Sequence, residues 1–81
     1  MTNADKMFEE LGYKKVKDSK LEVVYKDEET LLGDKFCITI AFYKISKRVQ
    51  TYDEKNKSLA VTIPELKAIN QKCKELGWLD D

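Results

Sequence analysis

Apolar residues at helical spacing occupy both ends of the chain. Near the start, one helical face is formed by Ala4, Met7, Phe8 and Leu11. Near the end, positions three or four apart are occupied by Leu66, Ile69, Cys73 and Leu76. Thr62 and Glu65 stand at capping-box spacing, and Pro64 fits a first helical turn because its missing N–H costs nothing there. The pattern predicts one amphipathic helix at each end.

Both predicted helices end in the same way. Gly12 is followed by Tyr13, and Gly77 is followed by Trp78. A glycine just past a helix adopts the left-handed conformation, and the residue after it folds back as a hydrophobic contact. This shared capping chemistry explains the similarity of the two ends, and we infer no internal repeat.

Between the helices, apolar and polar residues alternate as they do in half-buried strands. The clearest alternation gives a predicted core face made of Phe36, Ile38, Ile40 and Phe42. The opposite face of this strand then carries Cys37, Thr39, Ala41 and Tyr43. A one-residue slip would turn all four core side chains outward, so the faces are well specified.

Three further segments predict strands. They are Leu21 to Lys26, Arg48 to Tyr52, and the alternating Leu59, Val61 and Ile63. In the first, Val24 faces away from Val23 and Tyr25. We expect the acidic run Asp27 to Thr30 to form a loop, and Lys44 to Lys47 to reverse the chain.

These elements predict an α+β fold and a single domain spanning residues 1–81. It should contain an antiparallel sheet of four to five strands, with an N-terminal and a C-terminal helix packed on one face. The other face is then open to water or to a partner. The residues expected to be buried are Phe36, Ile38, Ile40, Phe42, Leu66, Ile69 and Leu76.

The chain lacks the side chains that most catalytic sites need. It contains no histidine, the commonest general base near neutral pH and the commonest metal ligand. Two isolated cysteines do not supply a four-ligand zinc site, and the three glycines lack the spacing of a phosphate-binding loop. The acidic run lacks the ligand spacing of a calcium loop. We predict no enzyme, with no catalytic residue, cofactor or metal.

The net charge and the two cysteines indicate further which classes of protein are disfavoured. Fifteen basic and fifteen acidic side chains cancel, which argues against a dedicated binder of nucleic acid or membrane surfaces. The sequence shows no targeting segment and no long apolar stretch, and Cys37 and Cys73 do not form a disulfide framework. We expect a cytoplasmic protein without membrane contact, whose cysteines act as small buried apolar residues.

The open sheet face is the candidate binding site. Thr39 and Tyr43 are predicted to lie there, and the register of the hairpin decides whether Arg48, Gln50 and Tyr52 join them. Tyrosine and arginine are favoured at protein interfaces, so we predict a protein partner. Three alternatives remain: a nucleic-acid module that adds the lysine clusters at 14–20 and 44–48, a homodimer, or a half-exposed strand with no binding role.

The two ends of the chain resemble small uncharacterised proteins encoded by phages and prophages of Gram-positive bacteria. The resembling segments are 4–13, 64–69 and 76–78, with only the strand rhythm matching between them. Their residues occupy core and cap positions, and no binding residue is carried over. The resemblance implies a protein that binds and redirects a host or phage protein, host defence enzymes included.

Overall fold

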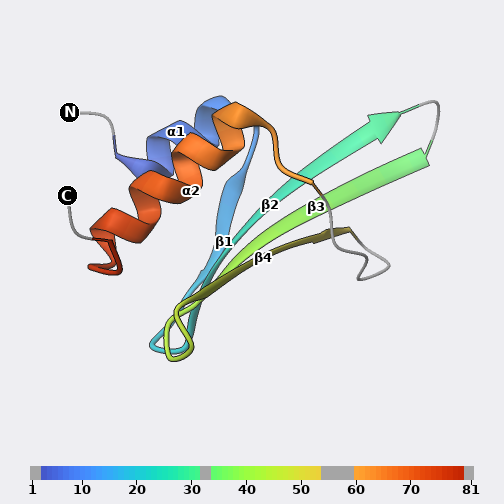
Figure 1. Cartoon of the computed structure of the whole chain (residues 1–81). Helices are drawn as coiled ribbons and strands as arrows, with labels where there is room; N and C mark the ends of the chain where they lie inside the picture. Colours follow the sequence, from blue (N-terminus) through green and yellow to red (C-terminus); the bar gives the residue numbers. More distant parts are fainter. Residues whose placement is uncertain (1–2, 32–33, 54–59, 80–81) are drawn as a thin grey trace.

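The chain folds into a four-stranded sheet with both helices on one side (Figure 1). The computed structural model describes residues 3–31, 34–53 and 60–79, and the side chains of 28–36 lie outside this description. In chain order the elements are α1 (Ala4–Glu10), β1 (Lys14–Asp18), β2 (Glu22–Leu31), β3 (Asp34–Tyr43), β4 (Arg48–Asp53) and α2 (Ile63–Glu75). The strands are antiparallel in the order β1-β2-β3-β4. The predicted α+β class is confirmed.

Side-chain caps begin both helices. The Oδ1 atom of Asn3 accepts a hydrogen bond from the backbone N–H of Lys6 at 2.8 Å, which satisfies a free donor of α1. In α2, the backbone N–H of Thr62 donates to the Glu65 carboxylate at 2.7 Å, and the Glu65 N–H donates back to the Thr62 hydroxyl at 3.3 Å. The predicted capping box is therefore confirmed.

Both helices also end as predicted. The backbone N–H of Tyr13 donates to the carbonyl of Phe8 at 2.9 Å, and that of Trp78 donates to the carbonyl of Cys73 at 2.9 Å. These are the bonds of a Schellman motif, which requires a left-handed residue just before the donor. The aromatic ring after each glycine is thereby turned back toward the core.

Alanine at either helix-ending glycine is expected to lower the free energy of unfolding by about 1–2 kcal/mol. The cause is the backbone, since φ is +93° at Gly12 and +77° at Gly77. A Cβ at Gly12 would also meet Oδ1 of Asp27 at 3.4 Å, whereas no described atom lies within 4 Å of one at Gly77. Urea unfolding should show Gly12→Ala at least as destabilised as Gly77→Ala. Gly77→Asn is the control because asparagine tolerates this conformation, and an unchanged Gly77→Ala midpoint would contradict the assignment.

The core lies between the helices and one face of β2 and β3. Its largest fully buried side chains are Tyr25, Phe8, Phe42, Ile40 and Val23. Phe8 of α1 stacks on Tyr25 of β2 with ring centroids 4.2 Å apart, and it meets the ring of Phe42 in an edge-on contact at 6.0 Å. The remaining core members come mainly from α2, namely Ala68, Ile69 and Cys73.

Most of the predicted core face is confirmed. Ile40 and Phe42 are fully buried, and Ile38 is partly buried against the same cluster. The side chain of Phe36 lies outside the described residues. Leu21 precedes β2 and is exposed, because the turn between β1 and β2 carries it beyond the helices.

The predicted acidic loop is wrong. Residues 27–30 continue β2 and pair with β3, up to Leu31 opposite Asp34. A long neighbouring strand supplies backbone hydrogen-bond partners, and this outweighs the low strand preference of acidic side chains. Residues 32–33 lie outside the described residues.

The predicted last strand is also wrong. Val61 lies in the irregular segment before α2, and Ile63 is the first residue of that helix. The capping box at Thr62 fixes the start of α2 here, so the apolar alternation does not form a strand. Leu59 lies outside the described residues.

The buried stripe of α2 differs from the predicted one. Ile69 and Cys73 are buried and Leu76 is partly buried, but Leu66 is 49% exposed. Lys72, at 8% exposed, occupies an inward position instead. The helix packs against α1 as well as the sheet, which turns its inward face toward the side of Lys72 and away from Leu66.

Candidate interaction face

The side of the sheet turned away from the helices is called the open face. Its position follows from strand alternation, because Val23 and Ile40 pack under the helices and their neighbours in sequence point the other way. The register then places on it Lys14, Lys17, Glu22, Val24, Lys26, Cys37, Thr39, Ala41, Tyr43, Arg48, Gln50 and Tyr52. No described helix covers this face (Figure 1).

All five predicted site residues lie together on the open face. In the β3–β4 pair, Tyr43 stands opposite Arg48, and Thr39 stands opposite Tyr52. Gln50 lies between the two pairs, and its Oε1 atom accepts a hydrogen bond from the Tyr43 hydroxyl at 2.9 Å. Partial burial is the main cause that raises the pKa of Tyr43 above its ordinary value, so the hydroxyl stays protonated near neutral pH.

The members of this group differ in how much surface they offer. Arg48 and Gln50 are exposed, and Tyr43 and Tyr52 are half-buried. Thr39 is only 3% exposed and therefore provides little contact area. Val24 and Ala41, also predicted to be displayed, are buried too, although they are not part of the core under the helices. A small residue between longer side chains exposes little area even on an open face.

The register adds basic residues that the sequence did not place. Lys14 stands opposite Lys26, which stands opposite Thr39, so one row crosses from β1 to Tyr52 on β4. The alternation of β2 in the sequence already places Lys26 on the same face as Val24. The sequence contains no such pattern for the lysines of β1, because only the pairing of β1 with β2 decides which of them share this face.

The predicted lysine cluster at 14–20 is divided between the two sides of the sheet. Lys14 and Lys17 lie on the open face, and Lys17 forms an ion pair with Glu22 at 2.7 Å. Lys15 points to the helix side, where its Nζ atom lies 3.0 Å from Oδ2 of Asp5. Strand alternation separates Lys14 from Lys15, and a β-bulge between Lys15 and Lys17 shifts the register by one residue and so returns Lys17 to the open face.

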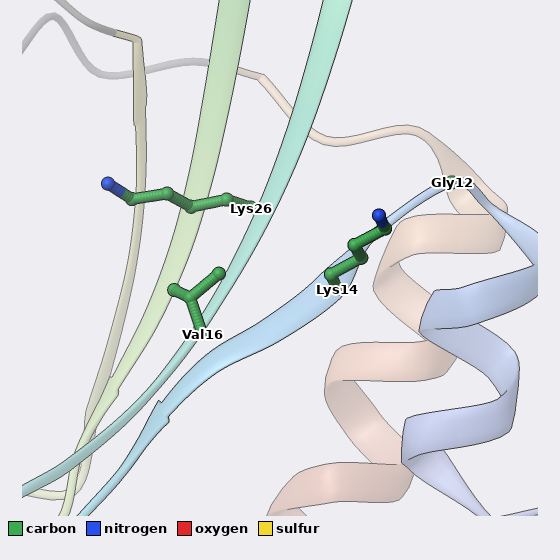
Figure 2. A pocket seen from close by; sticks show the side chains of 4 residues that line it. All are labelled: Gly12, Lys14, Val16 and Lys26. Atoms are coloured by element: carbon green, nitrogen blue, oxygen red, sulfur yellow. The ribbon is translucent and has the colours of Figure 1, made fainter.

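A hollow of about 410 Å³ opens beside the bulge and is lined by Gly12, Lys14, Val16 and Lys26. Figure 2 shows Lys14 and Val16 carried by β1 and Lys26 carried by β2, with the Lys26 side chain directed away from β1. Val16 is 54% exposed, so an apolar surface lines this hollow together with the two lysine side chains. No residue of this hollow was among the predicted site residues.

A polar cluster lies on the helix side, next to a smaller groove of about 260 Å³ between α1 and β1. Its centre is Asp5, which accepts a hydrogen bond from the Tyr25 hydroxyl and lies 3.9 Å from Nζ of Lys72. The Tyr25 hydrogen bond is the main cause that lowers the pKa of Asp5; partial burial opposes it, and the ammonium groups of Lys15 and Lys72 support it. Burial and the nearby carboxylate raise the pKa of Tyr25. The cluster joins α1, β1, β2 and α2, and we assign it to stability.

The described residues form no candidate metal centre. No three Cys, Asp or Glu side chains among them gather closely enough to hold an ion. Cys73 is buried, which raises the pKa of its thiol, and Cys37 is half-buried. The helices of the described part of the chain are all too short or too polar to cross a bilayer.

The fold and the open face define a small α+β domain with one uncovered sheet surface. No protein-family model, curated protein or solved structure matches this chain. Its function is therefore inferred from the residues of the open face.

Proposed function

We propose that this chain is a non-enzymatic accessory protein that binds a protein partner through its open face. The observation that carries the proposal is the gathering of Tyr43, Arg48, Gln50 and Tyr52 on one uncovered surface of adjacent strands. Tyrosine and arginine are enriched among the few residues that carry most of the binding energy of protein interfaces. The buried Ala41 lies opposite Gln50, and the buried Val24 of β2 lies beside Ala41.

The resemblance to phage proteins suggests where such a partner acts. On this proposal the protein works in the cytoplasm of a bacterial host and binds a host or phage protein. A defence enzyme that it inhibits or redirects is one such partner. Its lack of histidine and its small size suit a role in which binding itself produces the effect.

Alanine at both Tyr43 and Arg48 is expected to weaken partner binding about tenfold or more, because each removes an anchor of the interface. The partner is recovered with tagged protein from nuclease-treated lysate of a Gram-positive bacterium and identified by mass spectrometry. Calorimetry with the purified partner then measures the affinity. Lys6→Ala with Lys67→Ala is the control, since both lysines are exposed on helices. Unchanged affinity in a folded Tyr43 and Arg48 double variant would contradict the proposal.

A nucleic-acid-binding module is the second candidate function. The observation that favours it is charge, since the described side chains of the open face include four cations, Lys14, Lys17, Lys26 and Arg48, against the carboxylate of Glu22. Tyr43 and Tyr52 would then stack on bases. This candidate predicts retention of nucleic acid in the untreated pull-down and an affinity that falls steeply as salt rises. An affinity that does not change with salt would exclude it.

A further inference from the structure

Two lysines on the open face stand opposite each other in neighbouring strands. Lys14 and Lys26 are direct partners in the β1–β2 register. Like charges placed directly across two strands are destabilising. Among the described residues, neither forms an ion pair, whereas nearby Lys17 pairs with Glu22. An anion bound beside both lysines would reduce this repulsion.

The surface between these lysines is shaped to admit such a group. The β-bulge on β1 leaves Val16 exposed at the edge of the sheet, and the hollow of about 410 Å³ lies between Val16, Lys14 and Lys26. Figure 2 shows Val16 between the two lysines, with the ammonium group of Lys26 directed away from Lys14. Gly12 lines the hollow as well and adds no side chain that would fill it. A carboxylate there would accept charge-assisted hydrogen bonds from both ammonium groups once the flexible side chain of Lys26 turns toward it.

We propose that this hollow binds the carboxylates of an acidic segment of the protein partner, and that Val16 contacts an aliphatic side chain of the same segment. The inference rests on the proposed function, since it assigns the chemistry of the partner at one end of the open face. Binding relieves the repulsion between Lys14 and Lys26. The row that continues through Thr39 to Tyr52 then connects the hollow to the predicted contact residues.

The surroundings favour an acidic peptide over a nucleic-acid strand. A phosphate backbone needs a continuous basic track. The next row has the apolar Val24 and Ala41 at its centre, and its one cation, Lys17, is paired with Glu22 of the row beyond. Val16 offers an apolar contact in the hollow that the two lysines line, which suits an aliphatic side chain next to a carboxylate. Phosphate contacts alone would make no use of it.

The test is a titration of the full-length ¹⁵N-labelled protein followed by NMR. The probe is a short capped peptide in which Glu alternates with Val and Thr, and the matched peptide carries Gln in place of Glu. We expect the acidic peptide to shift the amide signals of residues 12–17 and 24–27, and the Gln peptide to bind at least tenfold more weakly. In Lys14→Gln with Lys26→Gln, affinity for the acidic peptide should fall about tenfold, which is about 1.4 kcal/mol.

Lys6→Gln with Lys67→Gln is the control of equal charge, and its affinity should stay within about twofold of wild type. The Lys14 and Lys26 double variant should melt at or above the wild-type temperature, because it removes the opposed charges. Equal binding of both peptides, equal loss in both double variants, or tighter binding of an oligothymidylate to the same residues would each overturn the proposal.

The result of the peptide titration can be distinguished from the result of the partner-binding experiment that tests the proposed function. If the peptide fails to bind while Tyr43 and Arg48 still control capture of the partner, only the acidic segment is wrong. If the peptide binds in the hollow while substitution at Tyr43 and Arg48 leaves capture unchanged, the proposed use of the rest of the open face is wrong.

Discussion

Phe8→Ala is expected to cost about 3–5 kcal/mol of the free energy of unfolding. A domain of this length has a total stability of about 4–12 kcal/mol, so this one change would remove a large share of it. Phe8 is fully buried, stacks on Tyr25 with ring centroids 4.2 Å apart, and makes edge-on contacts with Tyr13 and Phe42. It is the largest buried side chain of the short helix α1, which depends on such packing because seven residues do not form a stable helix alone.

Urea unfolding followed by circular dichroism and by Trp78 fluorescence measures this loss. Trp78 is a suitable probe because its ring lies 6.3 Å from that of Phe42 and reports on the same core. Glu9→Ala is the matched control, as its side chain is exposed on the same helix and should change stability by about 0.5 kcal/mol or less. A Phe8→Ala midpoint equal to that of the control would mean that α1 does not cover the sheet.

Asp5→Ala is expected to have the second-largest effect, about 2–3 kcal/mol. The substitution leaves the buried hydroxyl of Tyr25 without its acceptor and removes the carboxylate nearest to Lys72, which is only 8% exposed. Leaving a buried polar group or charge unpaired costs more than the net gain from the original contact. Asp5→Asn keeps an acceptor for Tyr25 and should lose less than the alanine variant. Equal stability of Asp5→Ala and wild type would show that the cluster is not structural.

The contribution of Asp5 should also be visible in how the free energy of unfolding changes with pH. The folded-state pKa of Asp5 lies below its ordinary value of 3.8, chiefly because of the Tyr25 hydrogen bond and then the two lysines. A lowered folded-state pKa means that the carboxylate contributes its full stability above the unfolded-state pKa. This contribution is lost as pH falls through the folded-state pKa. Wild type should therefore lose stability between about pH 5 and pH 2, and Asp5→Asn should lose less over that range. Parallel curves for the two proteins would contradict the assignment.

The ends of the helices and the core face of β3 were determined by the sequence alone. Their signals are local: the capping box of Thr62 and Glu65, the glycines at 12 and 77, and a period-two pattern through Ile40 and Phe42. Each acts within a few residues, so neighbouring sequence is sufficient to specify it. The same alternation placed Tyr43 on the side of the sheet opposite the helices.

Only the tertiary structure decided the features that depend on partners distant in sequence. Residues 27–30 became strand because β3 lies beside them, and Lys72 took an inward position on α2 because Asp5 of α1 receives its charge. Lys14 and Lys17 of β1 lie on the same surface as Tyr52 of β4. This arrangement depends on three strand registers and on the bulge at Val16. A one-residue change in any of these registers reverses which side chains share a face, and no local pattern in the chain specifies it.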